Sequence, residues 1–281
     1  MSNTQERPTA GPTFFKAHGH GNDYVVFTPG STWTAGEAAV QRVCDPHRGL
    51  GADGIVVVDN SGQHPSLRMF NPDGGEFERS GNGLRVAALA LRHWGLVDQD
   101  SFVVEVGGDR IPLSIHNEVG LETVEVSAGL GHARVGPEAI DMDREALLAS
   151  PELATLEVHP VSVGNPHVVV LSDDLSDDFL HRLGPLLASH PAIPRGTNVQ
   201  IVRIDSDGVR IRIWERGVGK TSASGTSASA VAVAMVESGR LSAGRHRIQM
   251  DGGDFVVAVD ESLDVTLRGP IQTVAEGTLT E

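Results

Sequence analysis

Two glycine-rich stretches carry the residues whose types and spacing are best suited to chemistry. The first, NPDGGEFERSGNGLR at 71–85, places Ser80 and a glycine before an apolar run. The second, WERGVGKTSASGTS at 214–227, places Ser224 and a glycine in the same way. Glycine lets the backbone approach a ligand closely, and a helix that begins after such a pair offers unpaired N–H groups and a positive dipole end. Each stretch therefore predicts a binding site for a carboxylate.

Taken singly, each stretch is also explained by a serine N-cap followed by a tight turn. The second stretch adds Glu215 and Arg216, which could pair with an ammonium group and clamp a carboxylate. Because the arrangement occurs twice, we expect two helix starts that face each other and hold one carboxylate from both sides. Four further polar clusters read individually as turns; they are HGHGND at 18–23, HRGLGADG at 47–54, GNPH at 164–167 and GTN at 196–198.

Composition narrows the classes of partner. The chain has 281 residues, with 37 acidic against 22 basic side chains and a formal charge of −15. This balance predicts no nucleic-acid partner and no anionic membrane partner. The N-terminal 11 residues contain no apolar core of a signal peptide, and no apolar run is long enough to cross a membrane, so we expect a cytoplasmic protein.

No metal and no cofactor are expected. The single cysteine, Cys44, excludes a disulfide framework and argues against a cysteine-based metal site. No lysine motif for a pyridoxal Schiff base and no Walker or Rossmann pattern is present, since GVGKT at 217–221 follows its strand too closely to be a phosphate loop. A small-molecule amino acid remains the expected partner, and a homodimer stays open.

The rest of the chain predicts an α/β (α+β) protein that is rich in short strands. β-branched runs bounded by Gly, Asp, Asn or Pro recur in both halves. Two segments, Gly83–Gly95 and Thr226–Gly239, are alanine-rich helices that end at glycine. Weaker helices are predicted at Ala35–Asp45, Asp143–Ala149 and Asp178–Ala188.

One unit of strands, Gly-rich stretch, helix and more strands therefore occurs twice. The segment Gly129–Pro137 is the best candidate for a linker. We expect a first domain at 12–130 together with a C-terminal strand at 268–281, a second domain at 131–267, and a flexible tail at 1–11. In this expectation the two domains are pseudo-symmetric.

Six ordered motifs resemble the diaminopimelate epimerase family over nearly the whole chain; they are HGxGNDY, GxGADG, FNPDGGE…SGNGLR, GNPH, GTNV and WERGVGxT…SGT. The resemblance implies a curled, mostly antiparallel sheet around a central helix in each domain. It also implies a cofactor-independent isomerase that converts LL- to meso-diaminopimelate by two-base proton transfer at the α-carbon, in lysine and cell-wall precursor biosynthesis.

The resemblance further assigns roles to residues. The carboxylate at the inverted carbon would be held by backbone amides of Gly81, Asn82, Gly225 and Thr226. The distal amino-acid end would be held by the side chains of Asn22, Asn71, Asn165, Asn198, Glu215 and Arg216.

The departure from the family lies at the two catalytic positions, where the resemblance implies cysteine and this chain has Ser80 and Ser224. A thiol has a pKa near 8.5, and an alkanol is weaker by roughly five or more units. We hypothesise that Ser80 with His167, and Ser224 with Glu215, act as two acid/base units.

Two alternatives stay open. The chain could be a serine-variant racemase or isomerase for another amino acid. It could also be a catalytically impaired form, including one in which serine has been substituted for cysteine, that binds an amino acid without turnover. Ser227 stands where the family usually has glycine, so the neighbourhood of Ser224 differs as well.

Overall fold

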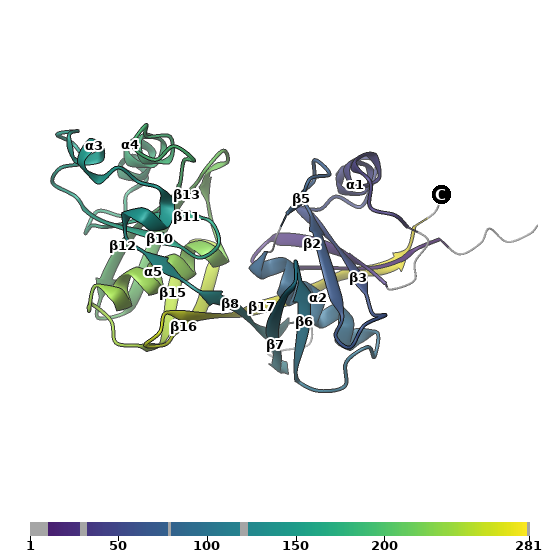
Figure 1. The fold of residues 1–281 in the computed structure, drawn as a ribbon. Helices are drawn as coiled ribbons and strands as arrows, with labels where there is room; N and C mark the ends of the chain where they lie inside the picture. Colours follow the sequence, from purple (N-terminus) through teal and green to yellow (C-terminus); the bar gives the residue numbers. More distant parts are fainter. Residues whose placement is uncertain (1–10, 29–32, 78–79, 119–122, 280–281) are drawn as a thin grey trace, which may run out of the picture. The chain divides into compact units, whose positions relative to one another are not determined.

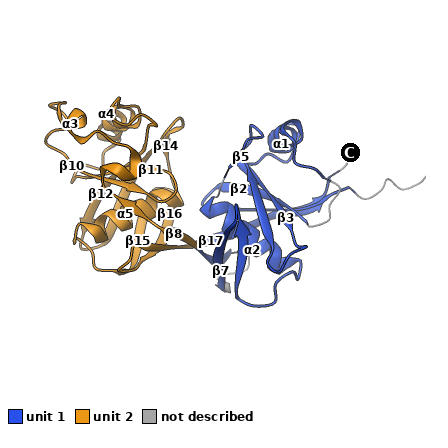
Figure 2. Cartoon of the chain, viewed as in Figure 1, with its two compact units in different colours: residues 1–128, 270–281 blue, residues 129–269 orange. Residues whose placement is uncertain are grey.

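The computed structural model describes residues 11–28, 33–77, 80–118 and 123–279, so the tail expected at 1–11 lies, apart from Gly11, outside the described residues. The chain forms two compact units (Figure 2), residues 1–128 with 270–281 and residues 129–269. The sequence predicted borders after residue 130 and before residue 268, whereas the units change after residues 128 and 269. Each unit is described by itself.

The described residues of unit 1 contain two helices, and its elements follow one another along the purple-to-teal part of Figure 1. These elements are β1 (Thr13–Gly19), β2 (Asn22–Phe27), α1 (Glu37–Cys44), β3 (Gly54–Asp59), β4 (Ser66–Phe70), β5 (Glu76–Phe77), α2 (Gly81–His93), β6 (Ser101–Val106), β7 (Asp109–Glu118) and β8 (Thr123–His132). From Pro270 onward β17 (Asp264–Thr278) also belongs to this unit.

Unit 2 repeats this order with additions at its beginning. Its elements are β9 (Arg134–Val135), the 3₁₀-helix η1 (Pro137–Ile140), α3 (Arg144–Leu148), β10 (Glu157–Ser162), β11 (Pro166–Leu171), α4 (Asp177–Ala188), β12 (Asn198–Asp205), β13 (Gly208–Glu215), β14 (Gly219–Thr221), α5 (Gly225–Glu237), β15 (Gly244–Met250), β16 (Gly253–Val259) and β17 (Asp264–Thr278). The five helices that the sequence predicted are all present, within a few residues of the expected bounds.

The strand pairing shows the internal duplication directly. In unit 1 the pairs β1–β2, β3–β4 and β6–β7 are antiparallel, and β2–β3 and β4–β6 are parallel. In unit 2 the same sequence of orientations runs through β10–β11, β12–β13 and β15–β16, with β11–β12 and β13–β15 parallel. The predicted fold class, two pseudo-symmetric halves with a mostly antiparallel curled sheet around a central helix, is confirmed.

The central helix of each unit is enclosed over most of its length, and in α5 small and apolar residues occupy nearly every side. In α5 every residue from Ser227 to Met235 is buried, and α2 is buried from Gly81 to Ala88. α2 packs on β1, β2, β3 and β7, and α5 packs on β10, β11, β12, β15 and β16. Small side chains, chiefly alanine, permit this close approach of helix and sheet.

A second helix in each unit covers the other face of the same strands. Alternate residues of a strand point to opposite faces. In β11, Val169 joins the core around α5, while Val168 and Val170 join the core under α4. In β2, Val26 likewise faces α2 and Val25 faces α1. This alternation decides which polar residues at the strand ends lie beside a central helix.

The segment Gly129–Pro137, predicted to be a linker, is mostly strand. β8 continues through it to His132, and β9 follows at once. The reason is that the inward alternation of Val126 and Ala128 is carried on by Leu130, so the glycines between do not end the strand. At the other end of the chain β17 includes the C-terminal segment expected as a strand, and it pairs with β1.

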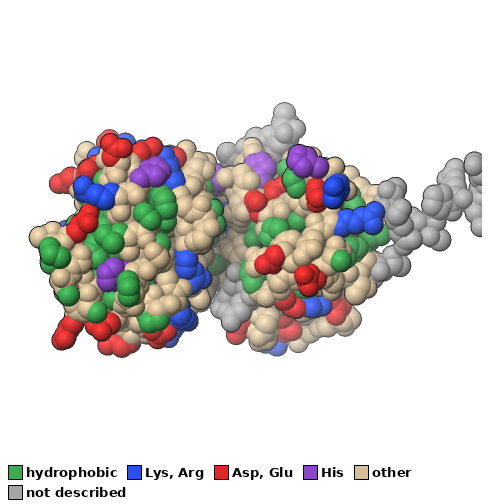
Figure 3. Space-filling view, turned by 90° about the horizontal axis from the view of Figure 1, so that it is seen from above, with side chains coloured by type: hydrophobic (Ala, Val, Ile, Leu, Met, Phe, Trp, Pro, Cys, Tyr) green, Lys and Arg blue, Asp and Glu red, His purple; other side chains and the backbone are tan. Residues whose placement is uncertain are grey.

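The surface carries acidic and basic side chains intermixed. On the face of Figure 3, Asp and Glu side chains lie among Lys and Arg in each unit. Bidentate or short pairs such as Arg68–Glu76 and Arg240–Glu157 account for part of this mixing. Among the described residues no helix is both long and apolar enough to span a membrane.

The packing of α4 yields a stability prediction. A Cβ added at Gly184 would lie 2.6 Å from the Trp214 ring, whereas alanine in a helix interior is otherwise favoured by about 1 kcal/mol over glycine. Overpacking costs roughly 1–3 kcal/mol, so Gly184→Ala should lower the unfolding free energy by up to about 2 kcal/mol. Chemical denaturation measures the change, and Gly62→Ala, where the nearest atom is 3.5 Å away, is the control. A Gly184→Ala protein more stable than the wild type would contradict the packing.

Candidate functional site

Both serines at the predicted catalytic positions are N-caps of the central helices. Ser80 Oγ accepts a hydrogen bond from Gly83 N at 3.2 Å at the start of α2. Ser224 Oγ accepts one from Ser227 N at 3.4 Å at the start of α5. An extended backbone conformation at each serine and a side-chain oxygen on the third residue's N–H are what N-capping requires.

The caps leave two backbone N–H groups at each helix start for a ligand. The first bonds within the helices are Leu84 N to Ser80 O and Ala228 N to Ser224 O. Since the serine side chain takes the third N–H, the first two N–H groups have no partner within the helix. These belong to Gly81 and Asn82 in unit 1 and to Gly225 and Thr226 in unit 2.

In unit 1 the side chain of Asn22, which was predicted to bind the ligand, is bonded to the side chain of Asn82, whose backbone amide was predicted to do so. Asn82 Nδ2 donates to Asn22 Oδ1 at 2.8 Å, and Asn22 Nδ2 donates to Asp53 Oδ2 at 2.9 Å. Asn82 Oδ1 accepts from the guanidinium of Arg85. The directions of both amides are therefore fixed from within the unit. Asn22 follows a two-residue hairpin loop, His20–Gly21, in which both φ angles are positive.

Arg85 places a charge beneath the first helix start. Its side chain is 0% exposed, and Nε donates to Gly81 O at 3.1 Å. Burial lowers the pKa of Arg85 to about 9, with Glu125 acting in the opposite direction. The guanidinium is still protonated at neutral pH. It adds a full positive charge to the partial charge of the helix N-terminus.

Ser80 has one further polar neighbour in its own unit. Burial raises the pKa of Tyr24 to about 12, while a hydrogen bond with the Ser80 side chain acts in the opposite direction. The Tyr24 ring lies against the glycines of both flanking segments, since a Cβ on Gly54 or Gly83 would be 2.5 Å or 3.2 Å from its Cε1 atom. The close fit keeps the phenol beside the helix start.

In unit 2 the predicted residues gather at one edge of the sheet. His167 of β11 pairs with Asn198 of β12, both near the start of parallel strands, and β13 ends beside them at Glu215. Asn198 Oδ1 accepts from Arg216 N at 2.9 Å, and its Nδ2 donates to Pro166 O at 3.4 Å. Asn198 therefore shapes the turn that carries Arg216.

Glu215 is held within its own turn, whereas Arg216 is held by the segment at the start of β12. Glu215 Oε1 accepts from Thr221 Oγ1 at 3.0 Å, and the Arg216 guanidinium donates to Arg195 O. Among the described residues no hydrogen bond joins Glu215 to Ser224, so that predicted pair stays a prediction. Ser80 and His167 lie in different units, and their pairing likewise stays a prediction.

His167 is the most perturbed group of the unit. It is 0% exposed, and its Nε2 lies 2.9 Å from Asn165 Oδ1. Burial lowers the pKa of His167 to about 3, reinforced by the charge of Arg216, while Gln200 acts in the opposite direction. The ring is therefore uncharged near pH 7. Gln200 and Ser227, also 0% exposed, are bonded to each other at 3.0 Å.

Comparisons with known proteins identify the family of the chain. A model of the diaminopimelate epimerase family matches residues 14–134 and 160–274. The diaminopimelate epimerase of Desulforudis audaxviator is 39% identical over 275 residues, covering 94% of this chain and 98% of that protein. Diaminopimelate epimerase 2 of Nostoc sp. is 33% identical and covers 95% of both chains. The chain belongs to the diaminopimelate epimerase family. It is thus an isomerase of the racemase/epimerase class, and an amino-acid epimerase.

Solved structures share the fold of the family. A PhzF-family phenazine biosynthesis protein of Bacillus anthracis superposes with a TM-score of 0.71 at 17% identity, over 97% of this chain and all of that one. A hydroxyproline epimerase of Agrobacterium vitis superposes with a TM-score of 0.65 at 16% identity, over 98% and 94%. At these identities the likeness shows the fold alone.

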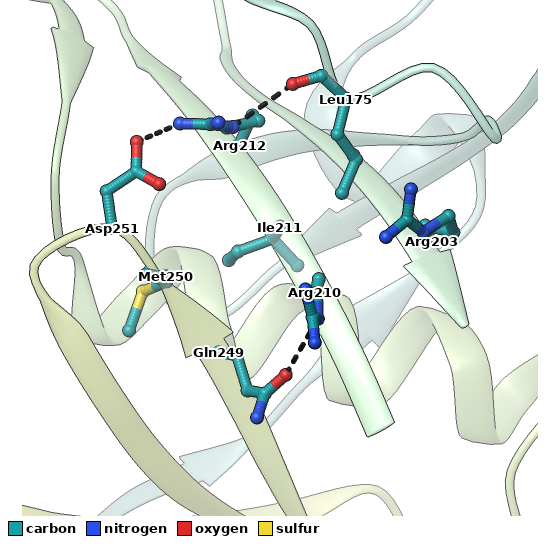
Figure 4. Close-up of a pocket in the computed structure, with 8 residues that line it drawn as sticks. All are labelled: Leu175, Arg203, Arg210, Ile211, Arg212, Gln249, Met250 and Asp251. Atoms are coloured by element: carbon teal, nitrogen blue, oxygen red, sulfur yellow. Dashed lines mark hydrogen bonds and ion pairs between the residues drawn. The ribbon is translucent and has the colours of Figure 1, made fainter. Parts of the chain in front are cut away.

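A polar pocket of about 480 Å³ in unit 2 lies apart from the epimerase residues (Figure 4). Its three arginines are already engaged, Arg212 with Asp251 and Leu175 O, Arg210 with Gln249, and Arg203 with Asp205. The pocket contains none of the residues that the sequence predicted. In the described parts of the chain, no three His, Cys, Asp or Glu side chains are grouped to hold a metal.

Sequence reasoning gave no role to five residues that the structure ties to the helix starts. Tyr24, Asp53 and Arg85 lie inside the motifs HGxGNDY, GxGADG and SGNGLR. Their position in these motifs is the sequence feature that could have identified them. Gln200 and Ser227 had no such signal, because the hydrogen bond between them joins a strand and a helix that are separate in the sequence. Asn71, which was predicted to bind the ligand, is exposed at the end of β4.

The buried His167 predicts an acid-sensitive stability. In the unfolded chain it binds a proton below about pH 6.5, whereas in the folded chain it does so only near pH 3. The unfolding free energy should therefore decrease as the pH is lowered from about 6.5 to 3. This group should contribute up to roughly 1.4 kcal/mol per pH unit. Denaturation series at several pH values should show a shallower slope for His167→Gln. The exposed His132→Gln serves as control, and equal slopes for all three proteins would contradict the assignment.

Proposed function

We propose that the protein interconverts LL- and meso-diaminopimelate without a cofactor by moving a proton between the two faces of the α-carbon. The observation that carries the proposal is the equivalent start of the two central helices. Each has a serine cap and two N–H groups without a partner in the helix. Family membership supports this choice of substrate, because the relatives that cover nearly the whole chain are named for it. The product would serve lysine and cell-wall precursor synthesis.

In this proposal the α-carboxylate binds to the N–H groups of both helix starts, which bring Ser80 and Ser224 to opposite faces of the α-carbon. The helix dipoles and the charge of Arg85 stabilise the negative charge that develops on the carboxylate when the α-proton leaves. The proton is taken from one face and a different proton is delivered to the other, so the carbon is inverted and no net atom is gained or lost.

The distal amino-acid end is recognised by opposite charges. The Glu215 carboxylate pairs with the ammonium group, and the Arg216 guanidinium with the carboxylate. The amides of Asn165 and Asn198 lie at the same sheet edge and complete this side. A substrate with two amino-acid ends uses all of these groups, whereas a small monofunctional amino acid would leave the Arg216 turn unused.

Of the two acid/base candidates, Glu215 suits the role better. It is only half-buried and its second carboxylate oxygen has no hydrogen-bond partner among the described residues. His167, with a pKa of about 3, is a weak base at neutral pH. We therefore assign His167 a positioning role and Glu215 the proton reservoir on the Ser224 side.

The reaction should be visible as isotope exchange. In D₂O, LL- or meso-diaminopimelate should gain deuterium at Cα, as followed by proton NMR, and Ser80→Ala/Ser224→Ala should reduce exchange to the background rate. Exchange at background in the wild type, together with a thermal shift on adding diaminopimelate, would replace the epimerase by a binder without turnover. Background exchange and no thermal shift would overturn the proposed substrate.

Thiols should raise the rate if the serines occupy the two base positions. Because the alkanol is weaker by roughly five or more pKa units and each unit corresponds to about 1.4 kcal/mol, Ser80→Cys/Ser224→Cys should increase kcat by at least about 10³-fold. The double variant Ser101→Cys/Ser238→Cys adds the same thiols away from the helix starts and should change nothing. Equal rates for both double variants would show that the helix starts do not flank the reacting carbon.

A further inference from the structure

A buried row of polar side chains in unit 2 joins the start of α5 to the sheet edge. His167 and Gln200 lie on the same face of β11 and β12, because His167 pairs with Asn198 and Val169 pairs with Gln200. That face meets α5, where Ser227 is bonded to Gln200. All three side chains are 0% exposed. At its other end the row reaches Asn165.

The two side-chain atoms of this row that are left without a hydrogen bond are both acceptors. Asn165 Oδ1 can only accept, so the His167 proton sits on Nε2. Burial keeps the ring neutral, with a pKa of about 3, and Nδ1 is then an acceptor. Gln200 directs Nε2 at Ser227 Oγ, so its Oε1 is left as a second acceptor. Among the described residues, neither Nδ1 of His167 nor Oε1 of Gln200 has a hydrogen-bond partner of good geometry in this arrangement, which is unfavourable in an interior.

Rotating the Gln200 carboxamide by a half-turn gives both unpaired acceptors a hydrogen-bond donor. Its nitrogen then donates to His167 Nδ1, and its oxygen accepts from the Ser227 hydroxyl. The two ends of a carboxamide are nearly equal in size, so the exchange leaves the packing unchanged. It also gives the Ser227 hydroxyl proton an acceptor, and Gln200 is the side-chain partner of this hydroxyl among the described residues.

Turning Asn165 instead is the less favourable solution. Asn165 would then donate to His167 Nε2, the ring proton would move to Nδ1, and Gln200 Oε1 would accept it. The Gln200 nitrogen would still face Ser227 Oγ, so the buried hydroxyl proton of Ser227 would have no acceptor in this row. Buried donors in folded proteins are paired in the great majority of cases.

We propose that Ser227, Gln200 and His167 form a one-directional hydrogen-bond relay that ends on Asn165 Oδ1 and so presents only the N–H₂ end of Asn165 to the ligand. Gln200 and Ser227 are positioning residues in this relay. At this point of the site the ligand must offer an acceptor, which selects a carboxylate over an ammonium group. The relay stands on unit 2 alone, whereas the identity of the ligand rests on the proposed function.

Unit 1 has no such relay at the equivalent positions. The hairpin residues Gly21–Tyr24 correspond to Gly164–His167, and the strand registers then match Val56 with Gln200. On the helix, Gly83 stands where unit 2 has Ser227. A valine and a glycine cannot pass on a hydrogen bond, so the relay is a property of the second half only.

The ring proton of His167 tests the relay directly. In protein labelled with ¹⁵N-histidine, long-range proton–nitrogen spectra should show His167 as the neutral Nε2–H form throughout pH 5.5–8. The signal is identified by its loss in His167→Gln. Gln200→Glu cannot donate to Nδ1 and should convert the ring to a form protonated on Nδ1. Ser229→Ala removes a neighbouring buried serine outside the relay and should leave the signal unchanged. A wild-type ring protonated on Nδ1 would overturn the relay.

Ligand selectivity tests what the relay does. Lysine is diaminopimelate without one carboxylate, so calorimetric affinities for the two ligands isolate the recognition of that group. Gln200→Met keeps the volume of the side chain and should weaken diaminopimelate binding about tenfold while changing lysine binding by less than about threefold. Equal losses for both ligands, in a variant that melts like the wild type, would overturn the selecting role. If the wild type binds neither ligand, the proposed substrate fails, and the histidine spectra still decide the relay.

Discussion

Each central helix is sealed inside its own sheet, and this burial decides where the unpaired backbone groups of its first turn can go. Gly81, Asn82 and Ser227 are buried, so their N–H groups have little access to water, whereas Gly225 and Thr226 are partly exposed. One serine takes the third N–H in each helix, and two N–H groups are left over. At Gly225 a Cβ would lie 2.5 Å from Leu267 Cδ2, so a larger residue there would require the Leu267 side chain to shift.

The duplication has kept the backbone and changed the polar interior. Arg85 and Ser229 occupy the same turn of their helices, and each bonds the carbonyl of the first helical residue, at 3.1 Å to Gly81 O and at 2.8 Å to Gly225 O. The contact is the same, but only unit 1 gains a buried charge. Unit 2 has instead the neutral row from Ser227 to Asn165. The helix start of unit 1 should therefore attract an anion more strongly. In unit 2 the neutral row instead fixes the orientation of the Asn165 carboxamide.

The sequence predicted the helices and the duplicated fold because these depend on local patterns. Alanine-rich runs that end at glycine, and β-branched runs between turn residues, report on short segments of chain. At 129–137 the division between the units does fall at the start of the predicted linker, but the glycines at 129 and 131 lie in a strand whose inward alternation continues. The sequence also could not identify Gln200, since the function of this residue comes from a strand register and a helix 27 residues away.

The serine caps themselves limit the chemistry that each half can perform. A hydroxyl oxygen that accepts from a backbone N–H still has its own proton to donate, so a capping serine is a natural proton donor and a poor base. Removing a proton requires alkoxide character, which a nearby cation and a helix dipole stabilise. Arg85 supplies that cation only in unit 1. On the Ser224 side no buried cation is bonded to the helix start among the described residues, and the half-buried carboxylate of Glu215 is the group available to accept a proton. If protons are exchanged at both faces of the α-carbon, the two serines are therefore assisted by groups of opposite charge: a buried cation on the Ser80 side and a carboxylate on the Ser224 side.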